Sequence, residues 1–123
     1  MTEGTAEDWG RLAVSLPGWR WTSGMHDTEG RTYVGCGEWV EVEGCAGLSI
    51  TAGRDDPLPD PDDPATAGCL LALLGDRLLG VFRRGDEWIV RINGYAADHA
   101  GSTLGRACIA AAVLLGRWPG GEG

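Results

Sequence analysis

Residues 53–64, GRDDPLPDPDDP, constrain the fold of this chain more than any other segment. The stretch holds five aspartates and four prolines, and proline lacks the amide hydrogen that helices and central strands need, so it must be an irregular loop. Asp63 is a favourable N-cap, and Pro64 suits a first helical position, where an amide hydrogen has no partner to bond. A helix is therefore predicted over 64–75, with an apolar face that comprises Leu70, Leu71, Leu73 and Leu74.

Two further helices are predicted from their capping residues and apolar spacing. Thr5 and Asp8 have the spacing of a capping box, and a helix over 6–16 would place Trp9, Leu12, Ala13 and Leu16 on one face. Pro17 and Gly18 end it. Ser102 or Thr103 can cap a third helix that runs to about residue 117, with a core face of Leu104, Ala107, Cys108, Ala111 and Leu115.

Five strands are predicted from alternating apolar residues. Val40 and Val42 alternate with Trp39, Glu41 and Glu43, as in a strand that buries one side. Arg84, Gly85 and Asp86 form the turn of a hairpin, and residues 94–101 are expected to be a loop. The predicted strands are 32–36, 38–43, 47–52, 78–83 and 88–93.

The resulting order, α-β-β-β-α-β-β-α, predicts the α+β class with three helices and one antiparallel five-stranded sheet. A sheet between two helix layers, as a helix-sheet-helix sandwich, would cover all three apolar helix faces. The length of 123 residues predicts a single domain over 1–123, because chains of this size bury enough surface for one core. The segment 118–123 is expected to be a flexible tail.

Negative charge is concentrated in the first half of the chain. Residues 1–63 hold thirteen acidic residues against four arginines, a difference of −9, whereas 64–123 hold five acidic residues against six arginines, a difference of +1. Such a field repels nucleic acid and anionic membranes and attracts a protein with a basic surface. The alternative is that the acidity serves solubility alone.

One candidate binding surface combines an aromatic residue with this acidity. Tryptophan is a frequent anchor in protein interfaces, and carboxylates around it would bind arginine or lysine. The surface is predicted to comprise Trp39, Glu38, Glu41 and Glu43, extended by Asp55 and Asp56 of the acidic loop. Alternatively, Trp39 packs under the first helix and the loop aspartates are solvated.

Two other functions are kept as alternatives. If the chain sequesters a small ligand or nucleotide, the anion would be bound by three arginines of the second hairpin, Arg83, Arg84 and Arg91. A structural or oligomeric component is the third hypothesis. Direct nucleic-acid binding is disfavoured, since three arginines without interleaved aromatic residues are weak support for it.

No catalytic or metal-binding motif is evident, and no cofactor is expected. Cys36, Cys45, Cys69 and Cys108 lack the paired spacing of zinc sites, so they are interpreted as core and rim residues. The pairs His26–Asp27 and Asp98–His99 join neighbours, which point to opposite faces of a strand. A phosphate-binding P-loop is excluded because the chain has no lysine. These features favour a non-enzymatic function.

Neither a membrane-spanning run nor a secretory signal is recognised in the sequence, which predicts a cytoplasmic protein. The longest apolar run, at 107–115, is too short to span a bilayer. The first ten residues, MTEGTAEDWG, lack the basic start and apolar centre of a secretory signal.

Two sequence segments resemble those of known proteins. LPGWRWTSGM at 16–25 and LPDPDDPATAGCLLALL at 58–74 resemble a group of uncharacterised small proteins of bacteriophages and prophages from GC-rich hosts. The second helix, the hairpin at Trp88 and the pattern of residues 100–114 are similar to the phage ABA-sandwich domain, a sheet between helix layers. The resemblance implies a phage-encoded accessory protein in the host cytoplasm. It brings no catalytic residue or ligand with it.

Overall fold

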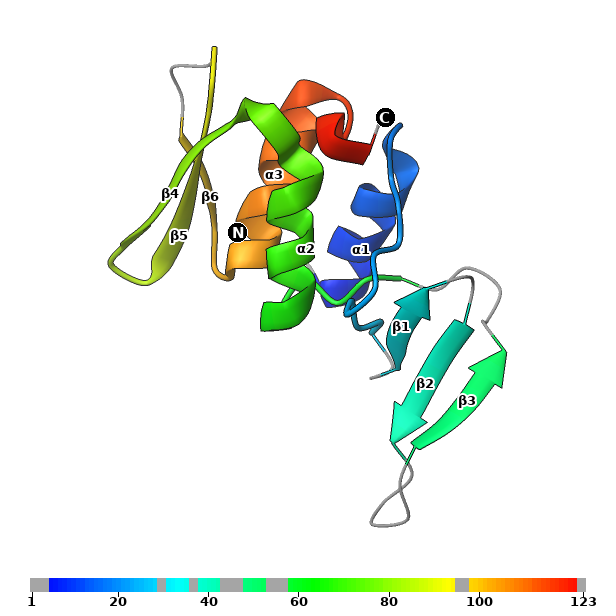
Figure 1. The fold of residues 1–123 in the computed structure, drawn as a ribbon. Coiled ribbons are helices and arrows are strands. Elements are labelled where there is room, and N and C mark those ends of the chain that lie inside the picture. The colour runs from blue at the N-terminus through cyan, green and yellow to red at the C-terminus, as the bar shows by residue number, and fades with distance from the viewer. Residues whose placement is uncertain are drawn as a thin grey trace.

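The computed structural model describes residues 5–28, 31–35, 38–42, 48–52, 58–94 and 98–121 (Figure 1). The described elements follow the order α1, β1, β2, β3, α2, η1, β4, β5, β6, α3, η2, where η1 (Gly75–Arg77) and η2 (Pro119–Gly121) are 3-10 helices. The strands form two separate antiparallel sheets, β1–β2–β3 and β4–β5–β6. The α+β class is confirmed, but the prediction of a single five-stranded sheet is wrong for the described strands.

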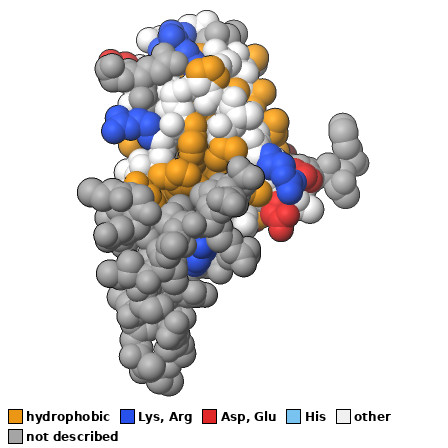
Figure 2. Space-filling view, turned by 90° about the vertical axis from the view of Figure 1, so that its right-hand side faces the viewer, with side chains coloured by type: hydrophobic (Ala, Val, Ile, Leu, Met, Phe, Trp, Pro, Cys, Tyr) orange, Lys and Arg blue, Asp and Glu red, His pale blue; other side chains and the backbone are white. Residues whose placement is uncertain are grey.

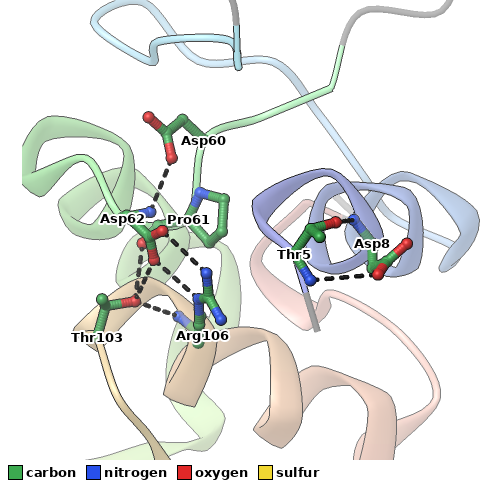
Figure 3. A network of polar contacts seen from close by, with 7 residues as sticks. All are labelled: Thr5, Asp8, Asp60, Pro61, Asp62, Thr103 and Arg106. Carbon is green, nitrogen blue, oxygen red and sulfur yellow. Dashed lines mark hydrogen bonds and ion pairs between the residues drawn. The ribbon is translucent and has the colours of Figure 1, made fainter. Parts of the chain in front are cut away.

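Helix α1 (Ala6–Ser15) begins with the predicted capping box. The Thr5 hydroxyl accepts a hydrogen bond from the Asp8 amide at 3.1 Å, and the Asp8 carboxylate accepts one from the Thr5 amide at 3.2 Å (Figure 3). The bond from the Thr5 amide, together with a smaller effect of the Thr5 side chain, lowers the pKa of the Asp8 carboxyl group. Four amides at a helix start have no partner within the helix, and this pair of side chains satisfies part of that need.

Helix α2 (Pro64–Leu74) begins as the acidic loop predicts. Asp63 is the N-cap, and its Oδ2 accepts a hydrogen bond from the Thr66 amide at 2.8 Å, while Pro64 takes the first position. The helix ends at Gly75, which adopts a positive φ of 61°. Few residues other than glycine accept this backbone conformation, so the glycine sets the helix end.

Helix α3 (Leu104–Leu115) is shorter than predicted. Thr103 is its N-cap, with its hydroxyl accepting a hydrogen bond from the Arg106 amide at 3.3 Å. Gly116 stops the helix in the left-handed conformation, before the predicted end at 117.

The second sheet consists of β4 (Leu78–Arg84), β5 (Glu87–Ile92) and β6 (Asp98–Gly101), with β5 in the centre. The hairpin β4–β5 is confirmed, with Val81 opposite Val90 and Arg84 opposite Glu87. Strand β6 lies in the segment predicted as a loop, and that prediction is wrong. Residues 98–101, DHAG, have little intrinsic strand preference, so the pairing with β5 determines their conformation.

All three helices lie on one side of the second sheet (Figure 1). Helix α3 packs against β5 and β6, and α1 and α2 pack against α3. The main core forms between these elements, and its fully buried members include Leu70, Val90, Ile92 and Ile109. The helix-sheet-helix sandwich is therefore not formed by the described elements, because the outward face of this sheet carries no described helix.

The first sheet consists of β1 (Thr32–Gly35), β2 (Glu38–Val42) and β3 (Leu48–Ala52), with β2 in the centre. It projects from the helical body, which comprises the three helices and the second sheet, and lies clear of the helices (Figure 1). Its three strands contact chiefly one another. The described strands therefore pair in two separate sheets, although the sequence order suggested one continuous sheet.

Trp118, at the start of the tail that was expected to be flexible, is fully buried. Its indole Nε1 donates a hydrogen bond to the Ala13 carbonyl at 2.9 Å, and its amide donates one to the Pro17 carbonyl at 2.8 Å. Burial of this large side chain against the end of α1 holds the chain in place shortly after the end of α3.

Candidate functional site

The predicted binding residues Glu38, Trp39 and Glu41 lie on β2, the central strand of the projecting sheet. Trp39 is opposite Tyr33 of β1 and Thr51 of β3, and Glu41 is opposite Ser49. Successive residues of a strand belong to opposite faces, so Trp39 and Glu41 share one face of the sheet. Glu38 belongs to the other face, with Val40 and Val42. Glu43, Asp55 and Asp56 lie outside the described residues.

A buried ion pair holds the start of this sheet. Asp27 and Arg31 are only 2% and 6% exposed, respectively. Arg31 donates to Asp27 Oδ2 from Nη2 at 2.7 Å and from Nε at 2.8 Å, and the Arg31 amide donates to Asp27 Oδ1 at 2.7 Å. The pair closes the turn that leads into β1. Asp27 is thus a structural residue, and its neighbour His26 contacts the Thr32 hydroxyl through Nδ1 at 3.3 Å.

The same turn is bonded to the loop before α2. Asp27 forms a β-bridge with Pro59, and the Thr28 amide donates to the Leu58 carbonyl at 2.9 Å. The buried Thr66 hydroxyl accepts a hydrogen bond from the His26 amide at 2.8 Å. Both ends of the segment that contains the first sheet are therefore held next to the first turn of α2.

The described aspartates of the acidic loop also have internal partners. Asp62 binds Arg106 of α3 through two oxygens, with Nε to Oδ1 at 2.9 Å and Nη2 to Oδ2 at 3.0 Å (Figure 3). The Thr103 hydroxyl lies 3.0 Å from the same Oδ1. Asp60 accepts a hydrogen bond from the Asp62 amide at 3.0 Å. This part of the loop joins the starts of α2 and α3, which is a structural role.

Two carboxyl groups of this loop have pKa values that shift in opposite directions. The bonds from Arg106 and Thr103 lower the pKa of Asp62, with the Arg106 bond having the largest effect. Burial raises the pKa of Asp60, because a charged carboxylate is disfavoured away from water. Asp62 therefore supports the fold as an anion.

The three arginines proposed to grip an anion do not converge. Arg83 and Arg84 are adjacent on β4 and belong to opposite faces of the sheet. Arg83 lies over the Trp88 ring, 5.6 Å from its centroid, and Arg91 lies over the Phe82 ring at 5.1 Å. Arg84 shares a face with Arg91 but is separated from it by four residues of the register, about 13 Å along the strands.

The described cysteines are consistent with core and rim positions. Cys108 is fully buried, and burial raises the pKa of its thiol to about 12. Cys69 is partly buried, which also raises its pKa. Within the described residues, no three His, Cys, Asp or Glu side chains lie close enough to share a metal ion. Cys36 and Cys45 lie outside the described residues.

Two of the hollows on the described surface adjoin segments discussed above. One, of about 360 Å³, lies between the starts of α2 and α3 beside Trp88, and its walls are mainly apolar. The other, of about 470 Å³, lies between β1, the segment 20–23 and the C-terminal end of α2. The second hollow was not anticipated from the sequence, because its walls come from four separate segments. The adjacent pair Arg20–Trp21 was its only local signal.

Comparisons with known proteins do not assign a family: no family model, curated protein or solved structure matches the chain. In the part of the chain that the structure describes, no helix is both long and apolar enough to cross a lipid bilayer.

Proposed function

We propose that this chain is a non-enzymatic, phage-type accessory protein that binds a basic host protein through the β1–β2–β3 sheet. Candidate partners are host defence factors and nucleic-acid-binding proteins, which present basic surfaces. One observation carries the proposal: the sheet projects from the helical body, and its central strand holds Glu38, Trp39 and Glu41 (Figure 1). A projecting sheet that carries an aromatic residue and carboxylates suits contact with a basic surface.

The engagement of the other described acidic residues of the first half of the chain supports this location. Asp27 is paired with Arg31, Asp62 with Arg106, and Glu7 and Asp8 lie within 3.7 and 3.5 Å of Arg11. Asp63 caps α2. Because these carboxylates already have partners in the fold, the acidic surface offered to a partner is expected to centre on β2 and the loops that adjoin it.

The charge distribution also favours a protein partner over nucleic acid. A difference of −9 over residues 1–63 repels phosphate backbones and accelerates encounters with basic proteins at low salt. A cytoplasmic location in the host cell follows from this proposal, because a phage accessory protein of this kind meets its partner there.

The proposal is tested by capturing a host protein with the immobilised chain and measuring its dissociation constant in solution. The affinity is expected to fall at least about tenfold between roughly 50 and 300 mM salt. The triple variant Glu38→Gln, Glu41→Gln, Glu43→Gln should weaken binding strongly. A matched control, Asp76→Asn, Asp86→Asn, Glu87→Gln, removes the same charge from exposed positions of the helical body and should bind nearly as the parent.

The two faces of the sheet can be distinguished by single variants. If the face with Trp39 contacts the partner, Glu41→Gln should weaken binding more than Glu38→Gln, because these residues belong to opposite faces. Salt-independent binding, or an equal loss in the body control, would contradict the proposal.

A second candidate function, an oligomeric phage component, is favoured by exposed apolar side chains. Leu12 of α1 is 45% exposed, and Val113 and Leu114 of α3 are 43% and 48% exposed. Figure 2 shows hydrophobic side chains along the middle of one side of the helical body, with charged groups at its margins. Light scattering at about 100 µM tests this candidate: a dimer or larger species that Leu12→Gln dissociates would support it, and a monomer would exclude it.

A further inference from the structure

The hollow between β1 and the C-terminal end of α2 has a chemical character that differs from the rest of this acidic chain. Its volume of about 470 Å³ lies in the range of small-molecule sites, roughly 300–1,000 Å³. Its polar walls are formed by Arg20, Thr22, Ser23 and Tyr33, and Trp21 adds an indole ring. Among the described residues that line it there is no carboxylate, although the chain has 18 acidic residues and a net charge of −8.

The aromatic wall of this hollow is held in place by a series of ring contacts. The Trp21 and Tyr33 rings lie 6.1 Å apart at a tilt of 42°. Trp21 makes an edge-to-face contact with Trp19 at 5.4 Å, and Trp19 contacts the buried Trp118 at 5.9 Å. The Trp118 hydrogen bond to Ala13 ties this series to α1. A wall fixed in this way can stack a planar ring without reordering its own side chains.

The polar groups of the hollow suit an anion. Arg20 is exposed, and among the described residues no carboxylate pairs with it, in contrast to Arg11, Arg31 and Arg106. The hydroxyls of Thr22 and Ser23 likewise have no hydrogen-bond partner in the described part of the chain. A guanidinium group with adjacent hydroxyl donors is a common arrangement for binding phosphate.

The back of the hollow depends on a close backbone contact. Gly120 of η2 lines the hollow, and a Cβ atom at this position would overlap the Ala72 carbonyl of α2. The close approach of η2 to α2 therefore requires glycine, and it adds a backbone surface to the aromatic and polar walls.

We propose that this hollow binds a small aromatic anion of the nucleoside monophosphate class. The base stacks on the wall formed by Trp21 and Tyr33, and the phosphate binds Arg20 with the hydroxyls of Thr22 and Ser23. The described lining holds one arginine and no carboxylate that could bind a magnesium ion, which favours a monophosphate over a triphosphate. This site is distinct from the acidic strand β2 and from the three arginines of the second hairpin.

Binding is tested by calorimetric titration with the 5′-monophosphates of adenosine, guanosine, cytidine and uridine, followed by the matching nucleosides and triphosphates. At least one monophosphate is expected to bind saturably below about 1 mM and more tightly than its triphosphate. Arg20→Gln should weaken monophosphate binding about tenfold or more, since it removes a charge-assisted contact, and should leave nucleoside binding nearly unchanged. Trp21→Leu should weaken both.

The matched control is Arg11→Gln, which removes one exposed arginine from α1, outside the hollow, and should bind the monophosphate as the parent does. Unfolding curves check that Arg20→Gln keeps the parent stability, as expected for an exposed side chain. The proposal is overturned if no monophosphate binds at about 5 mM, if the two arginine variants weaken binding equally, or if Arg20→Gln binds as the parent. Tighter triphosphate binding would overturn the monophosphate assignment.

Discussion

Asp62 and Arg106, separated by 44 positions in the sequence, form a two-point ion pair that joins the loop before α2 to the first turn of α3. The Arg106 side chain is 13% exposed and the Asp62 side chain 37% exposed. The pair lies beside the N-caps Asp63 and Thr103, so the two helix starts are fixed to each other as well as capped.

Loss of this pair is expected to destabilise the fold moderately. Asp62→Asn or Arg106→Gln should each lower the free energy of unfolding by about 1–2 kcal/mol, because charge-assisted bonds are lost at a partly exposed site. Urea unfolding measures the effect. The double variant should cost less than the sum of the single ones, with a coupling of about 1 kcal/mol. Strict additivity would show that the two side chains do not interact in solution.

The same carboxylate predicts an acid dependence. The folded-state pKa of Asp62 is lowered below its ordinary value of 3.8, mainly by Arg106. Its contribution is therefore fully present above pH 4 or so and is lost as the pH falls through the folded-state pKa. Asp62→Asn should reduce the acid sensitivity of the urea midpoint. The pKa of Asp60 is raised, so this group favours the folded state at low pH and disfavours it as the pH rises. Asp60→Asn should therefore not reduce the acid sensitivity.

Gly105 is expected to tolerate no side chain. A Cβ atom there would overlap the carbonyl of Pro61, at the contact between the acidic loop and α3. Gly105→Ala should therefore cost at least about 1–3 kcal/mol of unfolding free energy. The control is Gly68→Ala, because Gly68 lies within α2 with open space around it, and alanine there should stabilise the fold by about 0.5–1 kcal/mol. Equal effects at both sites would contradict the close packing at Gly105.

The buried pair Asp27–Arg31 is expected to be the most sensitive polar contact. Asp27→Ala should cost about 3–5 kcal/mol, because it leaves the buried Arg31 guanidinium without its carboxylate. Hydrogen exchange adds a local measurement: the Tyr33 amide, which donates to the Met25 carbonyl at 2.8 Å, should lose protection first. An unchanged exchange rate at Tyr33 would show that the pair does not hold β1.

The thiols of Cys69 and Cys108 should differ sharply in reactivity. In a variant with Cys36→Ser and Cys45→Ser, a thiol reagent at pH 8 should modify Cys69, at a rate below that of a free thiol because its pKa is raised. Cys108 is buried, with a pKa near 12, and should react only as fast as the protein unfolds. Rapid modification of both thiols in the folded state would contradict the burial of Cys108.

Local sequence signals predicted the helices well. Thr5, Asp63 and Thr103 each cap the helix for which they were named, because a capping bond involves residues only three positions apart. Glycines at 75 and 116 account for the ends of α2 and α3. The same reasoning missed β6, since its strand conformation depends on β5 rather than on its own residues.

Long-range pairing explains the other differences. The division into two sheets depends on contacts between distant strands, which alternation within a strand does not reveal. The burial of Trp118 depends on α1, more than a hundred residues earlier. For the candidate sites, the prediction grouped Glu38 with Trp39 and Arg83 with Arg84, although the two-residue period of a strand assigns the members of each pair to opposite faces. The hollow at Arg20 could not be derived, because it needs the placement of β1 against α2.

The bridge between Asp27 and Pro59 has an architectural consequence. Because the chain leaves the helical body at residue 28 and returns beside it at residue 58, the first sheet behaves as an insertion with adjacent entry and exit points. The capped helices, the second sheet and the buried Trp118 form a continuous scaffold without it. Sequence changes in β2 and β3 are therefore expected to affect this scaffold less than changes at Arg31, whose buried pair with Asp27 closes the entry point of the insertion.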